Sequence, residues 1–175
     1  METYYIVTFI GDDRPGLVEQ LSSVIESNRG NWHESRLSEL AGKFAGLILV
    51  SLPSDTGDKL ERELKALSTS GLSLRVTPTA SGALPQSGRA ITLNLIGPDR
   101  LGIIREISRT LAQRDINVLD MDSQVDSAPM SGEMIFKARI DASVPRDTDL
   151  DDLYDTLEEI ANQMTLEIDL EPLSF

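Results

Sequence analysis

The sequence predicts an α+β fold made of two copies of one small domain, and three observations predict it. First, residues 10–18 (IGDDRPGLV) match residues 96–104 (IGPDRLGII) at an offset of 86 residues. Second, the pattern that follows this motif recurs at the same offset, so that Ser22 falls on Ser108. Third, strand-like and helix-like periods alternate in the same order in both halves. The chain therefore reads as an internal duplication.

The two predicted domains span residues 1–79 and 89–175, with a linker at residues 80–88. The segment around this linker (TASGALPQSG, residues 79–88) is small, polar and rich in helix and strand breakers. The length of 175 residues accommodates two domains of this size.

In the first copy, β-branched and aromatic residues at 4–10 predict a strand that stops at Gly11. Apolar residues at helical spacing from Leu17 to Ile25 predict a helix that ends near residues 28–30. The other predicted elements are a polar strand at 31–40, a turn at 41–43, a buried strand at 44–52, a helix through Leu60, Leu64 and Leu67 closed by residues 70–71, and a strand at 72–78.

The second copy repeats this order. Its predicted elements are a strand at 90–96, a helix through Ile103, Ile104, Ile107 and Leu111, a hairpin of strands 117–125 and 134–140, an acidic helix from Leu150 to Ala161, and a half-exposed strand at 166–170. The order β-α-β-β-α-β is that of the ferredoxin-like unit. We expect two antiparallel four-stranded sheets, each with its helices on one face. A unit of this size leaves apolar surface uncovered, so we also expect pairing of domains and a homodimer.

Composition excludes several classes of function. The formal net charge is −13, and residues 141–175 hold 11 acidic residues against the single base Arg146. Direct binding to nucleic acid or to an anionic membrane is therefore not expected. The chain has no Cys and one His, which leaves no cysteine cofactor site and no His-rich metal site. No apolar run is long enough to span a membrane and the start lacks a basic signal region, so we expect a cytoplasmic protein.

The turn between the first strand and helix of each copy is the one motif that suggests chemistry. Residues 11–16 and 97–102 each show Gly-x-x-x-x-Gly, but Leu17 and Ile103 follow where a phosphate-binding loop would have Lys. What remains is a helix start whose backbone N–H groups favour a small anion such as a carboxylate. An adjacent Asp can balance an ammonium group, and the two together describe an amino acid.

Other interpretations of the same residues stay open. Asp12, Asp13 and Asp99 can simply cap the helix starts or complement their charge, and the glycines can simply make the turns. The acids of the last helix are either a solvated face or a docking surface for a basic partner. Trp32 packs at an interface or is partly buried, and His33 is expected on the surface without a catalytic role. No nucleophile–base pair, metal cluster or cofactor motif is apparent, so we expect a protein that is not an enzyme and needs no cofactor.

The motif Gly-x-Asp-Arg-x-Gly, followed by two apolar residues at the end of the first strand, resembles that of the ACT domain, a regulatory module that commonly binds amino acids. Two copies and little else resemble the glycine cleavage system transcriptional repressor family. That resemblance implies control by a small amino acid, glycine above all, and action through a DNA-binding activator protein. Carried over by position, the ligand-binding residues are Asp13, Arg14, Gly16, Leu17 and Asn31 in the first copy, and Asp99, Arg100, Gly102, Ile103 and Asn117 in the second.

Two classes of function follow from these observations. The first is a transcriptional co-regulator that responds to an amino acid and works through a partner protein. The second is an amino-acid-sensing regulatory subunit of a metabolic enzyme. Pro15 in the first turn stands where the second has Leu101, which leaves open whether both turns bind ligand.

Overall fold

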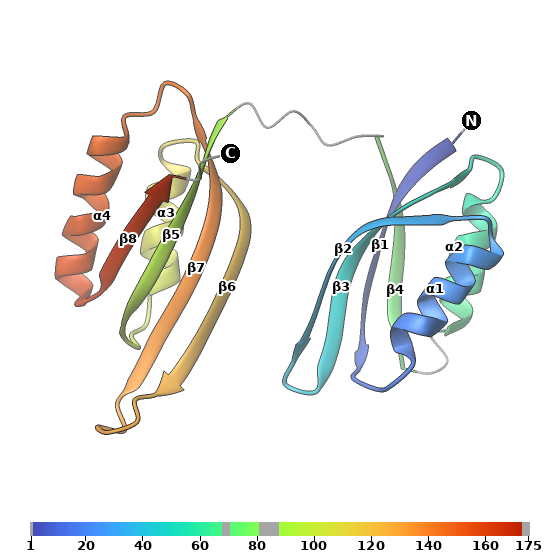
Figure 1. The fold of residues 1–175 in the computed structure, drawn as a ribbon, viewed down its shortest axis with the longest axis horizontal. Helices are drawn as coiled ribbons and strands as arrows, with labels where there is room; N and C mark the ends of the chain where they lie inside the picture. Colours follow the sequence, from blue (N-terminus) through green and yellow to red (C-terminus); the bar gives the residue numbers. More distant parts are fainter. Residues whose placement is uncertain (1, 68–70, 81–87, 173–175) are drawn as a thin grey trace. The chain divides into compact units, whose positions relative to one another are not determined.

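The computed structural model describes residues 2–67, 71–80 and 88–172. The chain divides into two compact units, Met1–Ala83 and Leu84–Phe175, and each has its own sheet and helices (Figure 1). Residues 81–87, most of the predicted linker, lie outside the described residues.

The first unit has the predicted order of elements. They are β1 (Glu2–Asp12), α1 (Leu17–Ser27), β2 (Asn31–Leu40), β3 (Lys43–Pro53), α2 (Gly57–Ala66) and β4 (Ser73–Thr79). The strands form an antiparallel sheet in the order β2-β3-β1-β4. Both helices cover the same face of this sheet (Figure 1).

The second unit repeats this architecture. Its elements are β5 (Gly88–Pro98), α3 (Ile103–Ala112), β6 (Asn117–Ser127), β7 (Met134–Pro145), α4 (Leu150–Met164) and β8 (Glu167–Pro172). The sheet order is β6-β7-β5-β8, again antiparallel. The prediction of two ferredoxin-like units in an α+β fold is confirmed.

The predicted bounds differ from the observed ones mainly at the ends of strands. β1 begins at Glu2 and ends at Asp12, because its pairing with β3 continues without interruption to both ends. β7 extends to Pro145 for the same reason, since it pairs with β5 along its whole length. Helix α2 ends at Ala66, one residue before the last apolar position predicted for it. Backbone pairing does not depend on side-chain polarity, so polar strand ends are invisible to an apolar pattern.

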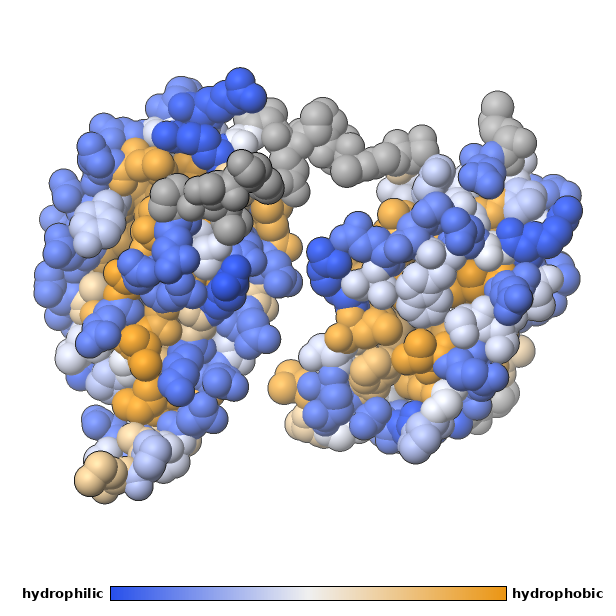
Figure 2. All heavy atoms as spheres, in the orientation of Figure 1, coloured by the Kyte–Doolittle hydropathy of each residue, from blue (hydrophilic) through white to orange (hydrophobic). Residues whose placement is uncertain are grey.

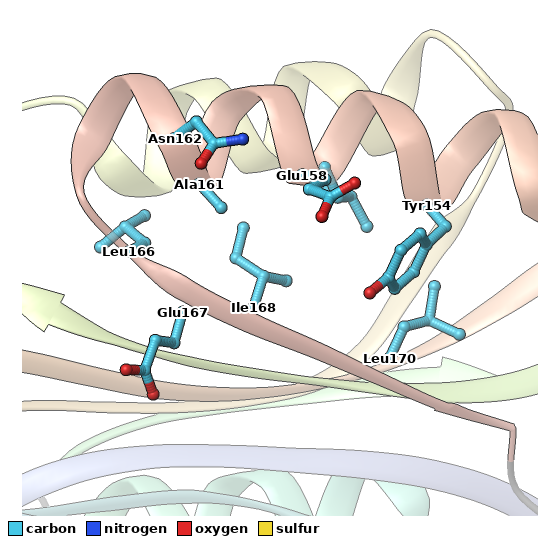
Figure 3. Close-up of a pocket in the computed structure, with 9 residues that line it drawn as sticks. Tyr154, Glu158, Ala161, Asn162, Leu166, Glu167, Ile168 and Leu170 are labelled. Atoms are coloured by element: carbon cyan, nitrogen blue, oxygen red, sulfur yellow. The ribbon is translucent and has the colours of Figure 1, made fainter.

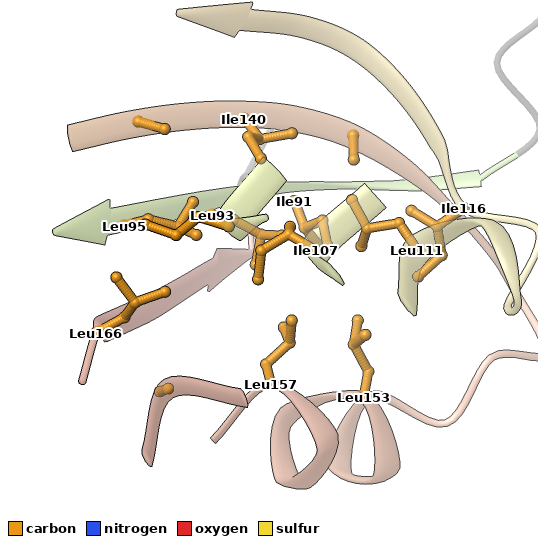
Figure 4. Packing of buried hydrophobic residues seen from close by; sticks show 14 of the residues in the cluster. Ile91, Leu93, Leu95, Ile107, Leu111, Ile116, Ile140, Leu153, Leu157 and Leu166 are labelled. Carbon is orange, nitrogen blue, oxygen red and sulfur yellow. The ribbon is translucent and has the colours of Figure 1, made fainter. Parts of the chain in front are cut away.

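Each unit has a separate hydrophobic core between its sheet and its helices. In the second unit, Leu153 and Leu157 of α4 point toward Ile107 of α3 and toward the sheet (Figure 4). All three side chains are at most 1% exposed. Burial of one such side chain contributes roughly 1.5–3 kcal/mol, so each core stabilises its own unit.

The two helices of each unit are joined by a polar contact that we call the helix latch. In the first unit, Asn28 Nδ2 donates to Glu63 Oε2 of α2 at 2.6 Å and to the Val24 carbonyl at 2.8 Å. The position equivalent to Asn28 holds Arg114 in the second unit, where it donates to Asp152 Oδ2 at 2.8 Å and Thr156 Oγ1 at 2.6 Å. The same contact between helices is thus made by different chemistry in the two copies.

The sheet face opposite the helices, which we call the open face, differs between the units. In the first unit its central residues are mostly apolar: Ile6, Thr8, Ile10, Ala45, Leu47 and Leu49. Ile10 and Leu47 are each 50% exposed. The equivalent residues of the second unit are Thr92, Asn94, Ile96, Lys137, Arg139 and Asp141. Among these, Asp141 accepts a hydrogen bond from Thr92 and pairs with Arg139, so this open face satisfies much of its own polarity.

In the described part of the chain, none of the helices combines the length and the apolar character needed to cross a membrane.

Candidate functional site

The two β–α turns share an unusual backbone geometry. Gly16 and Gly102 immediately precede their helices with φ of 85° and 94°, in the left-handed region that side chains rarely adopt. A Cβ added at either position would meet no atom within 4 Å. The glycines are therefore required by the backbone conformation, while the space beside them is open.

The starts of α1 and α3 carry no side-chain cap in the described structure. The first helical hydrogen bonds run from Gln20 N–H to the Gly16 carbonyl and from Glu106 N–H to the Gly102 carbonyl. Helix α4 differs, because Asp149 accepts hydrogen bonds from the N–H groups of Asp151 and Asp152. The interpretation that Asp12, Asp13 or Asp99 caps a helix by a hydrogen bond is therefore wrong, while the interpretation that these acids complement the charge of the helix start stays a prediction. The helix-start N–H groups retain their capacity for a carboxylate.

Other partners hold the side chains of the first turn. Asp12 forms an ion pair with Lys43 of β3. The hydrogen bond from Lys43, followed by its charge, lowers the pKa of Asp12 below its usual value. Arg14 Nη2 donates to Gln20 Oε1 at 3.0 Å. Asp13 is exposed, and its N–H donates to the Gly42 carbonyl at 3.0 Å. This last bond ties the β–α turn to the neighbouring hairpin.

The second turn has the same anchor but a different charge environment. The Asp99 N–H donates to the Met134 carbonyl at 2.8 Å, as Asp13 does to Gly42. Pro98 and Ile135 occupy the positions of the Asp12–Lys43 ion pair. Asp99 and Arg100 are both exposed.

Two predicted ligand residues contribute only backbone to such a site. Leu17 and Ile103 are each 2% exposed and belong to the hydrophobic cores of their units. Their side chains cannot line an open pocket, although their N–H groups lie at the uncapped helix starts.

The predicted asparagines lie far from the turn of their own unit. Asn31 is opposite Ser51, which in turn is opposite Tyr4, whereas the turn follows Asp12 at the other end of β1. Eight residues at about 3.3 Å each place Asn31 roughly 26 Å from the turn. Asn117 is displaced in the same way, opposite Ser143. One domain alone cannot bring an asparagine and a turn together around one ligand.

Both asparagines are followed by a β-bulge at the same position. His33 is the extra residue in β2 and Leu119 the extra residue in β6. Bulges redirect side chains and often occur near binding sites. Sequence periodicity did not reveal them, because one inserted residue disturbs the alternation only locally.

The bulge also brings His33 against a serine. His33 Nε2 lies 2.8 Å from Ser51 Oγ, and its ring packs against Tyr4 with centroids 5.5 Å apart. The sequence suggested no such nucleophile–base contact. Ser51 is only 2% exposed, so a substrate cannot reach its hydroxyl. Among the described residues no carboxylate orients His33, so we interpret the contact between His33 and Ser51 as structural.

A hollow lies elsewhere, between α4 and β8 (Figure 3). Its volume is about 270 Å³, and none of the ten predicted ligand residues lines it. A shallower hollow of about 500 Å³ lies on the open face of the second unit around Lys137 and Arg139. The hollow is not apparent from the sequence, because α4 supplies one wall and β8 the other.

A metal centre has no support in the structure. In residues 2–67, 71–80 and 88–172, no three His, Cys, Asp or Glu side chains gather closely enough to hold an ion.

The chain matches two family models and resembles solved structures in fold. Two ACT domain models match, one over residues 3–77 and the other over residues 91–162. A crystal structure of an unknown protein from Galdieria sulphuraria has a TM-score of 0.88 at 25% identity, covering 99% of this chain and 100% of that one. A candidate glycine cleavage system transcriptional repressor has a TM-score of 0.73 at 19% identity, covering 100% of this chain and 99% of that one.

A search of curated proteins finds no significant match. The two family models cover most of the chain, and each begins near the first residues of a β-α-β-β-α-β unit. The first glycine turn lies within the first matched range, and the second turn lies within the second. ACT domains are regulatory domains that bind amino acids, and the chain belongs to the ACT domain family, with two such domains in tandem.

Proposed function

We propose that this protein is a non-enzymatic regulator that binds a small amino acid at its β–α turns. The observation that carries the proposal is the uncapped helix start behind a left-handed glycine, present in both units. Helix-start N–H groups attract a carboxylate, and the exposed Asp13 and Asp99 stand close in sequence to balance an ammonium group.

The ligand site is completed by a second domain. Each turn is open on its own, and Asn31 or Asn117 lies at the far end of its sheet. A turn of one chain facing an asparagine of a second copy of the chain would enclose the ligand on both sides. An amino acid bound there would favour one arrangement of domains over another, which is what a regulatory signal requires.

The partner in this proposal is a DNA-binding activator, and the regulated genes are those of glycine cleavage. The similarity of the whole chain to a candidate glycine cleavage repressor supports this assignment, and glycine is the first ligand to test. The net charge of −13 suits a cytoplasmic protein that leaves contact with DNA to its partner.

The protein acts as a homodimer in this proposal, and the open face of the first unit supports it. That face exposes apolar residues where the second unit has charged ones. At its edge Glu34 and Arg36 pair with each other at 2.9 Å, so the charge there is balanced and does not oppose a contact between two copies.

Calorimetric titration with a panel of free amino acids tests the ligand assignment. We expect heat of binding for a small amino acid such as glycine, and loss of that heat in a variant with Asp13→Ala and Asp99→Ala. The control is Asp58→Ala, an exposed acid on α2. Binding that survives the paired substitution would show that the turns serve only the fold.

A gel-shift assay tests the division of labour with the partner. At physiological salt the protein alone should leave promoter DNA unshifted, because its charge opposes the phosphates. It should change the shift produced by the DNA-binding partner. Micromolar binding to DNA without a partner would contradict the proposal. If a pull-down recovers an enzyme and not a DNA-binding protein, the function as a regulatory subunit of that enzyme is favoured.

A further inference from the structure

The groove between α4 and β8 combines an apolar floor with an acidic wall. Ile168 and Leu170 of β8 face Tyr154 and Glu158 of α4 across the hollow (Figure 3). Ile168 and Leu170 are partly exposed, and Tyr154 is 48% exposed. In the space-filling view, apolar residues lie between hydrophilic ones over this region (Figure 2).

The charge around the groove has one sign. Glu158 of α4 and Glu167 of β8 line the groove, and Asp155 lies on α4 one turn before Glu158. Asp169 and Glu171 of β8 lie on the opposite face of the sheet, in register with Asn94 and Thr92. Within the described residues, no ion pair involves any of these five acids, and the nearest base in sequence, Arg146, precedes α4. The groove therefore offers apolar contact bordered by two acids without an ion-pair partner.

The corresponding place in the first unit is different. The buried pairs Leu60/Leu64 and Leu153/Leu157 align α2 with α4, which puts Lys65 at the position of Glu158. Lys65 forms an ion pair with Glu61 at 2.6 Å. The position of a groove-lining acid in the second unit is thus held by an ion-paired base in the first unit.

We propose that the α4–β8 groove binds a basic segment of a partner protein, with an apolar side chain of that segment seated over Ile168 and Leu170. This inference rests on the proposed function in taking the partner to be a protein. It assigns the docking surface, for which the chemistry of the groove gives three reasons.

Size, charge and edge position each favour this occupant. The hollow of about 270 Å³ has room for one or two side chains of such a segment. A second copy of the same groove would bring like charges together, which disfavours self-association there. β8 is an edge strand of its sheet, with β5 on one side only, so a partner can approach from the other side.

The probe for the test is a synthetic amphipathic helical peptide with one stripe of Leu and with Lys at all other positions. Its binding to the full chain is measured by fluorescence anisotropy and mapped by amide chemical shifts. We expect the shifts to concentrate in α4 and β8. A matched peptide with Ser in place of Leu should bind more weakly, because it keeps the charge and loses the apolar anchor.

Two variants separate groove contact from general attraction. Glu158→Lys changes a residue that lines the groove, whereas Glu159→Lys makes the same change on the exposed face of the same helix. The first should weaken binding by about tenfold or more, equivalent to about 1.4 kcal/mol. The second, with an identical net charge, should leave affinity within about a factor of three.

Three results would overturn the inference: equal effects of the two variants, equal affinity for the Leu and Ser peptides, or chemical shifts that map outside α4 and β8. These measurements contain no amino-acid ligand. The groove assignment can therefore fail while the titration with amino acids succeeds, and the reverse outcome is equally recognisable.

Discussion

Gly102 adopts φ of 94° at the start of α3, a conformation in which an L side chain is strained. We expect Gly102→Ala to lower the free energy of unfolding by about 1 kcal/mol. The left-handed strain of about 1–2 kcal/mol exceeds the gain of about 0.4–1 kcal/mol from a less flexible unfolded chain. Urea denaturation measures the difference.

The matched control is Gly102→Asn, because Asn tolerates the left-handed region better than Ala. The expected order of stability is Gly, Asn, Ala and then Val. An added Cβ at Gly102 meets no neighbour, so backbone strain alone should set the loss of stability in Gly102→Ala. A loss well above about 1 kcal/mol would contradict this, because it would require a steric contact at the turn.

Asp12 and Lys43 give the first turn a dependence on pH. Because Lys43 lowers the pKa of Asp12 in the folded state, the ion pair contributes stability above the unfolded pKa of about 3.9. That contribution disappears as the pH falls through the lower folded value. We expect Asp12→Asn to lose less stability than the parent protein between pH 7 and pH 3.

The comparison for this variant is Asp13→Asn, which removes a neighbouring exposed carboxylate. Urea midpoints at the two pH values should change for Asp13→Asn as they do for the parent protein. If Asp12→Asn loses as much stability as the parent protein between pH 7 and pH 3, the ion pair has no influence on folding.

At the scale of elements, the helix latches predict a different salt response for the two units. Asn28→Ala should cost about 1–2 kcal/mol, because it removes hydrogen bonds from a residue that is only 2% exposed. Arg114→Ala removes an ion pair whose partner Asp152 is exposed, so its cost should shrink at high salt. Thermal unfolding at low and high salt distinguishes the two, and equal salt dependence would refute the distinction.

The Asn28 latch also responds to acid. The hydrogen bond from Asn28 is the main cause that lowers the pKa of Glu63. The latch therefore stabilises the first unit at neutral pH and weakens as the pH falls through the folded pKa of Glu63.

The sequence predicted the elements well because apolar spacing is a local property. The helix that begins at Leu17 and the strand at residues 31–40 match α1 and β2. The latch was not predictable, because Asn28 and Glu63 meet only after two helices pack. The separation of roughly 26 Å between Asn31 and its turn was equally hidden, since motif matching carries no information about which end of a strand a residue occupies.

At the scale of the whole molecule, the open face of the first unit provides a test of the homodimer. Leu47 occupies the position that Arg139 holds in the second unit. We expect Leu47→Arg to shift the protein from dimer to monomer in light scattering, because it buries a charge in the proposed apolar interface. Arg139→Ala should leave the dimer unchanged, and a dimeric Leu47 variant would place the interface elsewhere.

The separate hydrophobic cores have a genetic consequence. Leu157 contributes to the second core alone, so Leu157→Asp should unfold the second unit and spare the first. If the first unit carries the contact between copies, the mutant chain would still dimerise with normal chains and inactivate the regulatory function of the mixed dimer. In a cell that expresses both alleles, such a lesion should be dominant. A lesion in the first core, such as Leu21→Asp, would remove the contact itself and should be recessive.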